Sequence, residues 1–306
     1  MEENSQVRYV VETEQLTKIY GKKTVLDHVS MHVAEGDIYG FIGKNGAGKT
    51  TLMKLLLGMS QPNEGSMKLF GTTKLNLARR HVGALIEEPA LYKTSTAKEN
   101  MKRFAILAGA DVDQIDELLQ LVGLADVGKK KVGKFSLGMK QRLGIAIAML
   151  GRPDLLILDE PINGLDPEGI KEVRDLLLRL NREQGVTILV SSHLLDELAK
   201  ITTRYGIINQ GHLVEEISAA DLLKQCQQKL QVVTDQPAVA AKVIKKLAPK
   251  ATITAHDNTI SVTGASVDSS KINQELVKAD VNVQSITFAA DNMEEYFIQR
   301  MGGQHD

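Results

Sequence analysis

The chain has 306 residues, of which 43% are hydrophobic and 25% charged, and its formal net charge is -1. The length predicts two domains, and the near-neutral charge argues against a generic nucleic-acid binder, which is usually basic. Cys226 is the only cysteine, so no disulfide can form within the chain and a reducing compartment is expected.

The first ~60 residues are predicted to be β-rich and then to form a strand, a loop and a helix. Apolar and polar residues alternate in Tyr9 to Leu16 and in Thr24 to Val33, as they do in half-buried strands. Asp37 to Ile42 is predicted to be a short buried strand that leads into a glycine-rich loop. The helix that follows, Thr51 to Leu57, is expected to end at Gly58.

A helical region interrupts the strand pattern in the middle of the chain. Val82 to Ile86 is predicted to be a buried strand, whereas Thr96 to Leu124 has apolar residues at three- and four-residue spacing. A glycine- and lysine-rich loop, Asp126 to Lys134, precedes an apolar helix that runs to Leu150. We therefore expect a helical insertion at about residues 90–150.

The strands then return as a repeating unit. Leu155 to Leu158 and Val186 to Val190 are apolar enough for buried strands, and Glu168 to Arg182 between them has a helical pattern. A strand, helix and strand at this spacing form a βαβ unit, which implies a parallel sheet.

The character of the sequence changes after about Ile217. Short predicted strands alternate with the predicted helices Pro237 to Leu247 and Ser270 to Lys278, which favours a small α+β domain. The strands are predicted at Gln231 to Val233, Thr252 to Thr254, Thr259 to Val262 and Val283 to Phe288. No internal repeat and no low-complexity linker divides the two parts.

No segment of the sequence predicts a membrane anchor. Met1 to Asn4 is acidic and lacks an apolar run, so we expect no signal peptide there. The longest apolar stretches, such as Ile145 to Leu150, are far shorter than the ~20 residues that span a bilayer. Any membrane role is therefore expected to depend on a partner.

Gly43 to Thr50 fits the phosphate-binding pattern G-x-x-x-x-G-K-[ST]. The glycines let backbone N–H groups wrap phosphates at a helix N-terminus. Lys49 is expected to reach the β- and γ-phosphates and the Thr50 hydroxyl to ligate Mg²⁺; the alternative is a glycine-rich turn with a solvated lysine. The predicted nucleotide-binding residues of this region are Gly43, Lys44, Asn45, Gly46, Ala47, Gly48, Lys49, Thr50 and Thr51.

Two adjacent acids, Asp159 and Glu160, follow the apolar strand Leu155 to Leu158. Ligands of open α/β sheets bind at the carboxyl ends of the strands, so both acids are expected at the nucleotide. Asp159 suits a Mg²⁺ contact through the metal's water shell, and Glu160 suits a general base that activates the attacking water. The alternative is that the pair only caps a helix.

The segment Phe135 to Arg142, between the glycine loop and these acids, resembles the signature motif of the ABC-transporter ATPases. In that family the motif acts in trans, across the interface of a head-to-tail dimer. The resemblance implies that Ser136 and Gly138 contact a nucleotide held by a second copy. An amphipathic core helix capped by Ser136 is the plain alternative, and it is compatible with the trans role. The resemblance covers about Val10 to Val214.

The same resemblance implies roles for three further residues. Tyr20 matches the aromatic A-loop that stacks on adenine; the alternative is a tyrosine packed beside a strand. His193 matches the histidine that contacts the γ-phosphate and the water, although a lone histidine at a strand end is usually structural. Asp166, in Asn163 to Pro167, matches the D-loop that links the two sites of a dimer, although an Asp N-cap followed by proline gives the same pattern.

Three of the sequence's departures from the family pattern bear on the site. The usual signature is Leu-Ser-Gly-Gly-Gln, and here Leu137 replaces a glycine, which restricts the backbone, while Met139 cannot donate a hydrogen bond. Glu87 stands where most members have the Q-loop glutamine that touches Mg²⁺ and the permease. These departures resemble the bacitracin- and lantibiotic-resistance branch of ABC exporters, which implies a peptide-antibiotic cargo.

The expected fold is an α/β P-loop NTPase of the ABC-ATPase type, with a parallel-sheet core, an antiparallel β subdomain and a helical subdomain. We expect this domain over residues 8–217 and an accessory α+β domain over 218–306. The expected cofactors are ATP and Mg²⁺, and the metal contacts are Thr50, Asp159 and Glu87.

The expected function is ATP hydrolysis that energises a separate integral membrane permease. The chain would work as a head-to-tail homodimer, cytoplasmic and held at the inner face of the cell membrane through the permease, without direct contact to nucleic acid. One alternative is a soluble ABC ATPase acting on nucleic acid or ribosomes; the chain has neither the long coiled-coil insertion nor the second cassette typical of those classes. The other alternative is a regulatory nucleotide-binding protein with little turnover.

Overall fold

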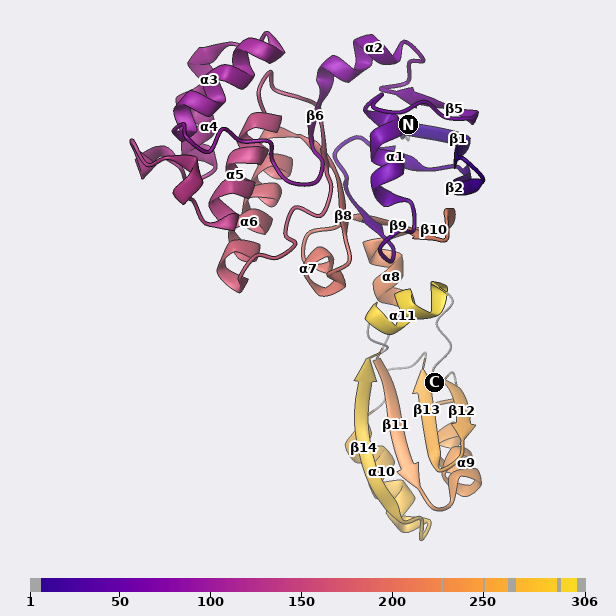
Figure 1. The fold of residues 1–306 in the computed structure, drawn as a ribbon. Coiled ribbons are helices and arrows are strands. Elements are labelled where there is room, and N and C mark those ends of the chain that lie inside the picture. The colour runs from indigo at the N-terminus through magenta and orange to yellow at the C-terminus, as the bar shows by residue number, and fades with distance from the viewer. Residues whose placement is uncertain (1–6, 227, 250, 264–267, 291–292, 302–306) are drawn as a thin grey trace, which may run out of the picture. The chain divides into compact units, whose positions relative to one another are not determined.

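The computed structural model describes residues 7–226, 228–249, 251–263, 268–290 and 293–301, and these form two compact units (Figure 1). The second unit spans Ala220–Gln299, and the first contains the residues before and after it. The predicted second domain, 218–306, differs from this unit at its end. Arg300 Nε pairs with Glu215 Oε2 at 3.0 Å, so the chain rejoins the first unit there. Residues 1–6, with the predicted acidic terminus, and 302–306 lie outside the described residues.

A six-stranded sheet forms the centre of the first unit, in the order β10-β9-β4-β8-β7-β6. Its five strands from β9 to β6 are parallel, and only β10 is antiparallel to its neighbour. The strands are β4 (Ile38–Ile42), β6 (Val82–Leu85), β7 (Leu155–Leu158), β8 (Thr187–Ser192), β9 (Arg204–Asn209) and β10 (His212–Ser218). The predicted βαβ unit is present, because β7 and β8 pair in parallel after α6 (Pro167–Gln184).

Helices cover both faces of this sheet, and Figure 1 shows α5 and α6 on the side of β8 away from α1. The remaining helices of this unit that precede β9 are α1 (Lys49–Leu56), α2 (Leu75–Ala78), α3 (Ala97–Ala108), α4 (Ile115–Leu121), α5 (Leu137–Ala148) and α7 (Leu195–Ala199). The predicted helical insertion is confirmed as α3, α4 and α5. Thr96 starts it with a capping box, in which its side chain accepts from the Glu99 N–H.

A second, antiparallel sheet packs over α1. It consists of β1 (Tyr9–Tyr20), β2 (Lys23–Val29), β3 (His32–Ala34) and β5 (Glu64–Leu69). One hydrophobic core joins β1 and α1 to the central sheet, with Leu16, Leu52 and Phe41 all fully buried in it. The predicted combination of a parallel-sheet core, an antiparallel β subdomain and a helical subdomain is therefore confirmed.

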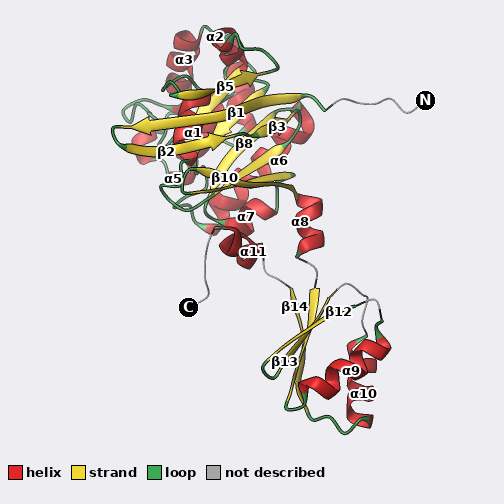
Figure 2. Ribbon diagram, turned by 90° about the vertical axis from the view of Figure 1, so that its right-hand side faces the viewer, coloured by secondary structure: helices red, strands yellow, loops and turns green. Residues whose placement is uncertain are grey.

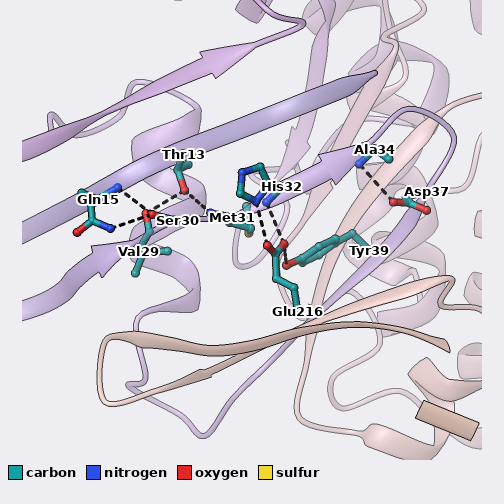
Figure 3. Close-up of polar contacts among 10 residues, drawn as sticks. All are labelled: Thr13, Gln15, Val29, Ser30, Met31, His32, Ala34, Asp37, Tyr39 and Glu216. Atoms are coloured by element: carbon teal, nitrogen blue, oxygen red, sulfur yellow. Dashed lines mark hydrogen bonds and ion pairs between the residues drawn. The ribbon is translucent and has the colours of Figure 1, made fainter. Parts of the chain in front are cut away.

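The single strand predicted for Thr24 to Val33 is wrong, because the chain breaks there into β2 and β3. Figure 3 shows the cause. The Thr13 hydroxyl donates to the Val29 carbonyl at 3.0 Å and accepts from the Met31 N–H at 2.8 Å. The buried Thr13 side chain thus takes the place of the backbone groups with which a continuous strand would have formed hydrogen bonds.

Glu216 on β10 ties the two sheets together (Figure 3). Its carboxylate accepts from the Tyr39 hydroxyl of β4 at 2.8 Å and from the His32 N–H of β3 at 2.9 Å, and His32 Nδ1 lies 3.0 Å away. Tyr39 is fully buried, and burial, followed by the negative charge of Glu216, raises the pKa of its hydroxyl well above the usual value. The hydroxyl therefore stays protonated and acts as a donor.

The Tyr39→Phe variant is expected to lose about 1–3 kcal/mol of unfolding free energy, because it removes a donor from a largely buried carboxylate. Chemical denaturation followed by circular dichroism measures this change. The matched control is Tyr9→Phe, which removes the hydroxyl of a tyrosine whose ring packs near His32 but leaves the Glu216 hydrogen bonds intact. Equal unfolding midpoints for Tyr39→Phe and the unmodified protein would contradict the prediction.

The second unit has the strand and helix order β-α-β-β-α-β, with a four-stranded antiparallel sheet in the order β12-β13-β11-β14. Figure 2 shows α9 and α10 on one face of that sheet. Leu230, Ile244 and Leu276 are buried in the core between them. Its elements are β11 (Gln228–Thr234), α9 (Pro237–Leu247), β12 (Thr252–His256), β13 (Thr259–Thr263), α10 (Ser269–Lys278) and β14 (Val283–Ala290).

Two further short helices, α8 (Ala219–Gln225) and α11 (Met293–Arg300), lie at the two ends of the second unit's residue range. Across the described parts of the chain, no helix combines the length and the apolar character needed to cross a bilayer.

Candidate functional site

The glycine loop lies between the buried strand β4 and the first turn of α1, as predicted. Gly48, with φ +115°, precedes α1 directly, and a Cβ there would stand 2.6 Å from Leu26 Cδ2 and 3.0 Å from the Val25 carbonyl. Only glycine fits this position, both for its backbone and for the space. The loop therefore has the tight shape that lets backbone amides face a phosphate.

Lys49 is turned back over the loop instead of into solvent. Its ammonium donates to the Gly43 carbonyl at 2.6 Å and to the Lys44 carbonyl at 3.4 Å, and the residue is only 5% exposed. The solvated lysine of the alternative interpretation is therefore not what the structure contains. A pocket opens above the loop, and its walls are formed by Lys23, Val25, Asn45, Gly46, Gly48, Lys49, Thr50, Thr51 and Glu160.

Glu160 reaches this pocket from the end of β7. Its Oε1 lies 3.4 Å from Lys49 Nζ, and its Oε2 accepts from Nδ1 of His193 at 2.8 Å. Oε1 is buried and, beyond this ion pair with Lys49, accepts no hydrogen bond from the described residues, so it can accept one from a water. No helix begins at Asp159 or Glu160, because α6 starts at Pro167, so the helix-cap alternative does not apply.

Thr50 and Asp159 meet on the other side of the loop. The Thr50 hydroxyl donates to Asp159 Oδ2 at 2.6 Å, and Asp159 is 4% exposed. A hydroxyl and a carboxylate are hard oxygen ligands, which suit Mg²⁺. Among the described residues, no group of three or more His, Cys, Asp or Glu side chains could hold a metal alone. The residues present thus fit a Mg²⁺ ion that takes further ligands from phosphates and water.

The Glu87 side chain pairs with Lys54 and not with Thr50 or Asp159. Its carboxylate accepts from Lys54 Nζ on α1 at 2.8 Å, and its side chain is 66% exposed. The hydrogen bond lowers the pKa of Glu87 and raises the pKa of Lys54. Glu87 also has φ +61°, which turns the chain sharply after β6. The predicted metal contact of Glu87 stays a prediction that requires this ion pair to open.

Tyr20 ends β1, and its side chain is half exposed. Its hydroxyl lies 3.3 Å from Ser60 Oγ, and Lys18 Nζ lies 4.8 Å from the ring centroid. The ring is not among the residues that form the walls of the loop pocket. An exposed aromatic ring at this strand end is available for stacking, but it also fits the alternative of a ring packed beside a strand.

The signature residues lie at the start of α5 and not in the walls of the loop pocket. Ser136 is the N-cap, and its hydroxyl accepts from the Met139 N–H at 3.2 Å. A Cβ at Gly138 would make only ordinary contacts, 3.7 Å to Gly169 Cα and 3.9 Å to Leu165 Cδ2. The packing of this chain therefore gives no reason for a glycine at position 138.

Asp166 caps α6, since its carboxylate accepts from the Gly169 N–H at 3.0 Å and Pro167 follows in the first turn. This is the cap that the plain interpretation predicted, and it leaves a role at a dimer interface open. One buried site residue, Ser191 on β8, is absent from the predicted set. The only feature of the sequence that could have indicated Ser191 is its position two residues before His193.

Comparison with known proteins gives consistent matches. Residues 26–163 match the family model described as ABC transporter. The chain is 40% identical over 301 residues to the bacitracin transport ATP-binding protein BcrA of Enterococcus faecalis, covering 97% of this chain and 98% of that protein. It is 44% identical over 207 residues to the lantibiotic transport ATP-binding protein SrtF of Streptococcus pyogenes, covering 68% of this chain and 90% of that one.

The first unit also resembles solved structures. The structure of an ATP-binding subunit of an ABC transporter aligns with a TM-score of 0.62 at 29% identity. The alignment covers 71% of this chain and 92% of that one.

Proposed function

Because the chain belongs to the ABC transporter ATP-binding family, we propose that it hydrolyses ATP to energise a separate permease that exports or expels peptide antibiotics of the bacitracin or lantibiotic type. The observation that supports the enzymatic part is the buried Oε1 of Glu160, which pairs with Lys49 and accepts no other hydrogen bond from the described residues. The similarity to BcrA over almost the whole of both chains supports the cargo class.

In the proposed binding step, the phosphates of ATP lie over the loop from Gly43 to Thr50. Lys49 turns its ammonium from the carbonyls of Gly43 and Lys44 toward the β- and γ-phosphates, where the negative charge is greatest. Mg²⁺, held by Thr50 and by Asp159 through water, would neutralise charge on the phosphate oxygens. Tyr20 would stack on adenine.

In the proposed chemical step, Glu160 accepts a proton from the water that attacks the γ-phosphate, the bond between the γ-phosphorus and the β–γ bridging oxygen breaks, and ADP leaves. Its Oε2 is already fixed by His193, so Oε1 is the oxygen that remains for the water. The His193 hydrogen bond orients the carboxylate. Glu160 and His193 follow the ends of the neighbouring strands β7 and β8, so the order of strands in the sheet brings the base and its orienting partner together.

The site is proposed to be completed by a second copy in a head-to-tail homodimer. Ser136 and Gly138 of one copy would close over the γ-phosphate bound by the other, and Asp166 would lie at the interface. The support is that these residues lie apart from the loop pocket of their own chain and that Gly138 has no packing need for glycine.

The Gly138→Ala variant separates this trans role from folding. Because a Cβ fits within the chain and alanine favours a helix, unfolding stability is expected to stay equal or to rise by up to ~1 kcal/mol. ATP-dependent dimerisation, measured by light scattering, and ATP turnover are expected to fall, since a methyl group would stand where a phosphate approaches the backbone. The control is Gly185→Ala at the end of α6; there φ is +69°, so stability should fall while dimerisation persists. Full dimerisation of Gly138→Ala would contradict the trans role.

Glu87 and the helical subdomain are proposed to form the permease-facing surface. Glu87→Gln is expected to leave basal ATP hydrolysis largely intact, because the residue contacts Lys54 and not the catalytic carboxylates. Coupling to the permease should fall, as seen in lower antibiotic resistance of cells that carry the variant. Glu88→Gln changes the exposed neighbouring acid and is the matched control. Full resistance with Glu87→Gln would count against a coupling role.

The test of the proposed function combines a biochemical and a cellular measurement. Affinity purification from native membranes should recover a polytopic membrane protein with the chain, and a deletion strain should become sensitive to bacitracin or to a lantibiotic. The alternative of a soluble ATPase for nucleic acid or ribosomes predicts ribosomal proteins or nucleic acid in the purified sample. That alternative is not favoured, because the full-length relatives are named as transport proteins.

A further inference from the structure

Ser191 is a buried hydroxyl residue that connects both acids of the site. It lies on β8, between β4 and β7 in the sheet, and is fully buried. Its hydroxyl donates to Asp159 Oδ1 at 2.6 Å and accepts from the Glu160 N–H at 2.9 Å. One side chain therefore holds the side chain of Asp159 and the backbone of Glu160 at the same time.

The hydrogen bond to the Glu160 N–H comes at the point where β7 stops following the sheet. The Asp159 N–H still donates to the Leu85 carbonyl of β6 at 2.9 Å, as a strand residue would. Glu160 then turns into the left-handed region with φ +49°, which is unfavourable for a residue with a Cβ. The Ser191 hydroxyl accepts the N–H of this strained residue, so it helps to keep the Glu160 carboxylate aimed at Lys49 and His193.

The hydrogen bond to Asp159 holds a carboxylate that is proposed to face the metal ion. Asp159 has one donor on each oxygen, Thr50 on Oδ2 and Ser191 on Oδ1. The Thr50 oxygen would also be a ligand of Mg²⁺, whereas Ser191 contacts the two acids and would not touch the metal. Ser191 would therefore hold this almost fully buried carboxylate through Oδ1, as a hydrogen-bond partner outside the metal's own ligands.

We propose that Ser191 is a positioning residue for ATP hydrolysis, which orients Asp159 for the metal-bound nucleotide and Glu160 for the attacking water. This inference rests on the proposed ATPase function. It assigns Ser191 no contact with the substrate, so its effect must pass through the two acids that it holds.

The experiment measures the affinity of the full-length purified chain for a fluorescent, non-hydrolysable ATP analogue, with Mg²⁺ and with EDTA. In Ser191→Ala the affinity in EDTA should be unchanged, and the gain in affinity on adding Mg²⁺ should shrink roughly tenfold. ATP turnover at saturating Mg²⁺-ATP should fall roughly ten- to a hundredfold. Ser191→Thr keeps the hydroxyl and should restore most of the Mg²⁺-dependent gain.

Ser192→Ala is the matched control, because Ser192 is the adjacent residue, is equally buried and accepts only the Leu194 N–H. It should keep the Mg²⁺-dependent gain of the unmodified protein. Thermal unfolding reports whether each variant is folded; if Ser191→Ala is not, Ser191→Cys, with its weak thiol donor, should show an intermediate loss.

Two results would overturn the inference alone: an unchanged Mg²⁺-dependent gain in Ser191→Ala, or an equal loss in Ser192→Ala. If the unmodified protein fails to hydrolyse Mg²⁺-ATP, both the proposed function and this inference fall.

Discussion

The Glu160→Gln variant is expected to lower ATP turnover roughly a hundred- to ten-thousandfold, because it removes the base that accepts the proton of the attacking water. Glutamine has nearly the shape of glutamate, so the pocket and the His193 contact geometry should survive. ATP binding should therefore remain, and the ATP-bound dimer should accumulate because it can no longer be resolved by hydrolysis.

Phosphate release measures the turnover of Glu160→Gln, and size-exclusion chromatography with ATP and Mg²⁺ measures the trapped dimer. Glu183→Gln makes the same chemical change at an exposed position of α6 and should behave like the unmodified protein. Normal turnover in Glu160→Gln would refute the proposed mechanism. Loss of turnover together with loss of ATP binding would also refute it, since the residue would then be needed to form the pocket.

Lys49→Met is expected to weaken ATP binding roughly ten- to a hundredfold, because a charge-assisted contact to the phosphates is lost. Hydrolysis should fall further than binding, since the same ammonium stabilises the charge of the γ-phosphate in the transition state. Isothermal titration with ATP gives the affinity, and phosphate release gives the rate.

Lys54→Met, on the same helix, is the control for Lys49→Met. Lys54 pairs with Glu87 in a largely exposed position, so its loss should leave ATP affinity close to normal. The Lys49→Met result is interpretable only if the variant is folded, and its melting temperature should be compared with that of Lys54→Met. Unchanged ATP affinity in a folded Lys49→Met protein would rule out the proposed role of the loop.

The elements that sequence patterns predicted best are those whose own residues determine their burial. Leu155 to Leu158 is apolar at every position, and the structure has β7 over that range. Pro237 to Leu247 starts with a proline suited to a first helical turn, and α9 has the same bounds. In such segments local preference and tertiary packing agree, so the sequence suffices.

Other elements depend on partners that are distant in the chain. The strand β5 exposes Glu64, Gly65 and Ser66, so its sequence lacks the alternation of apolar and polar residues that is typical of a strand. It forms because it pairs with β1. The strand β9 has a glycine, Gly206, inside a short apolar run, and it is fixed by lying beside β4. Pairing of this kind overrides the weak propensity of the segment itself.

The candidate site shows the same division. The glycine loop and the two acids follow from motif and strand order, because parallel strands bring their carboxyl ends to one edge. The Glu87–Lys54 ion pair and the contacts of Ser191 do not, since both depend on the direction in which individual side chains turn. The left-handed backbone conformation of Glu87 and Glu160 could not be predicted either, because glutamate does not favour it.

The Glu216 contacts have a consequence for ligand binding. Tyr39 belongs to the strand that leads into the phosphate loop, and His32 belongs to a strand paired with β1, which ends at Tyr20. Joining β3, β4 and β10 ties the sheet that contains Tyr20 to the sheet that leads into the phosphate loop before any ligand binds. The entropy lost in ordering the two sheets against each other is therefore lost during folding and not during association with a ligand.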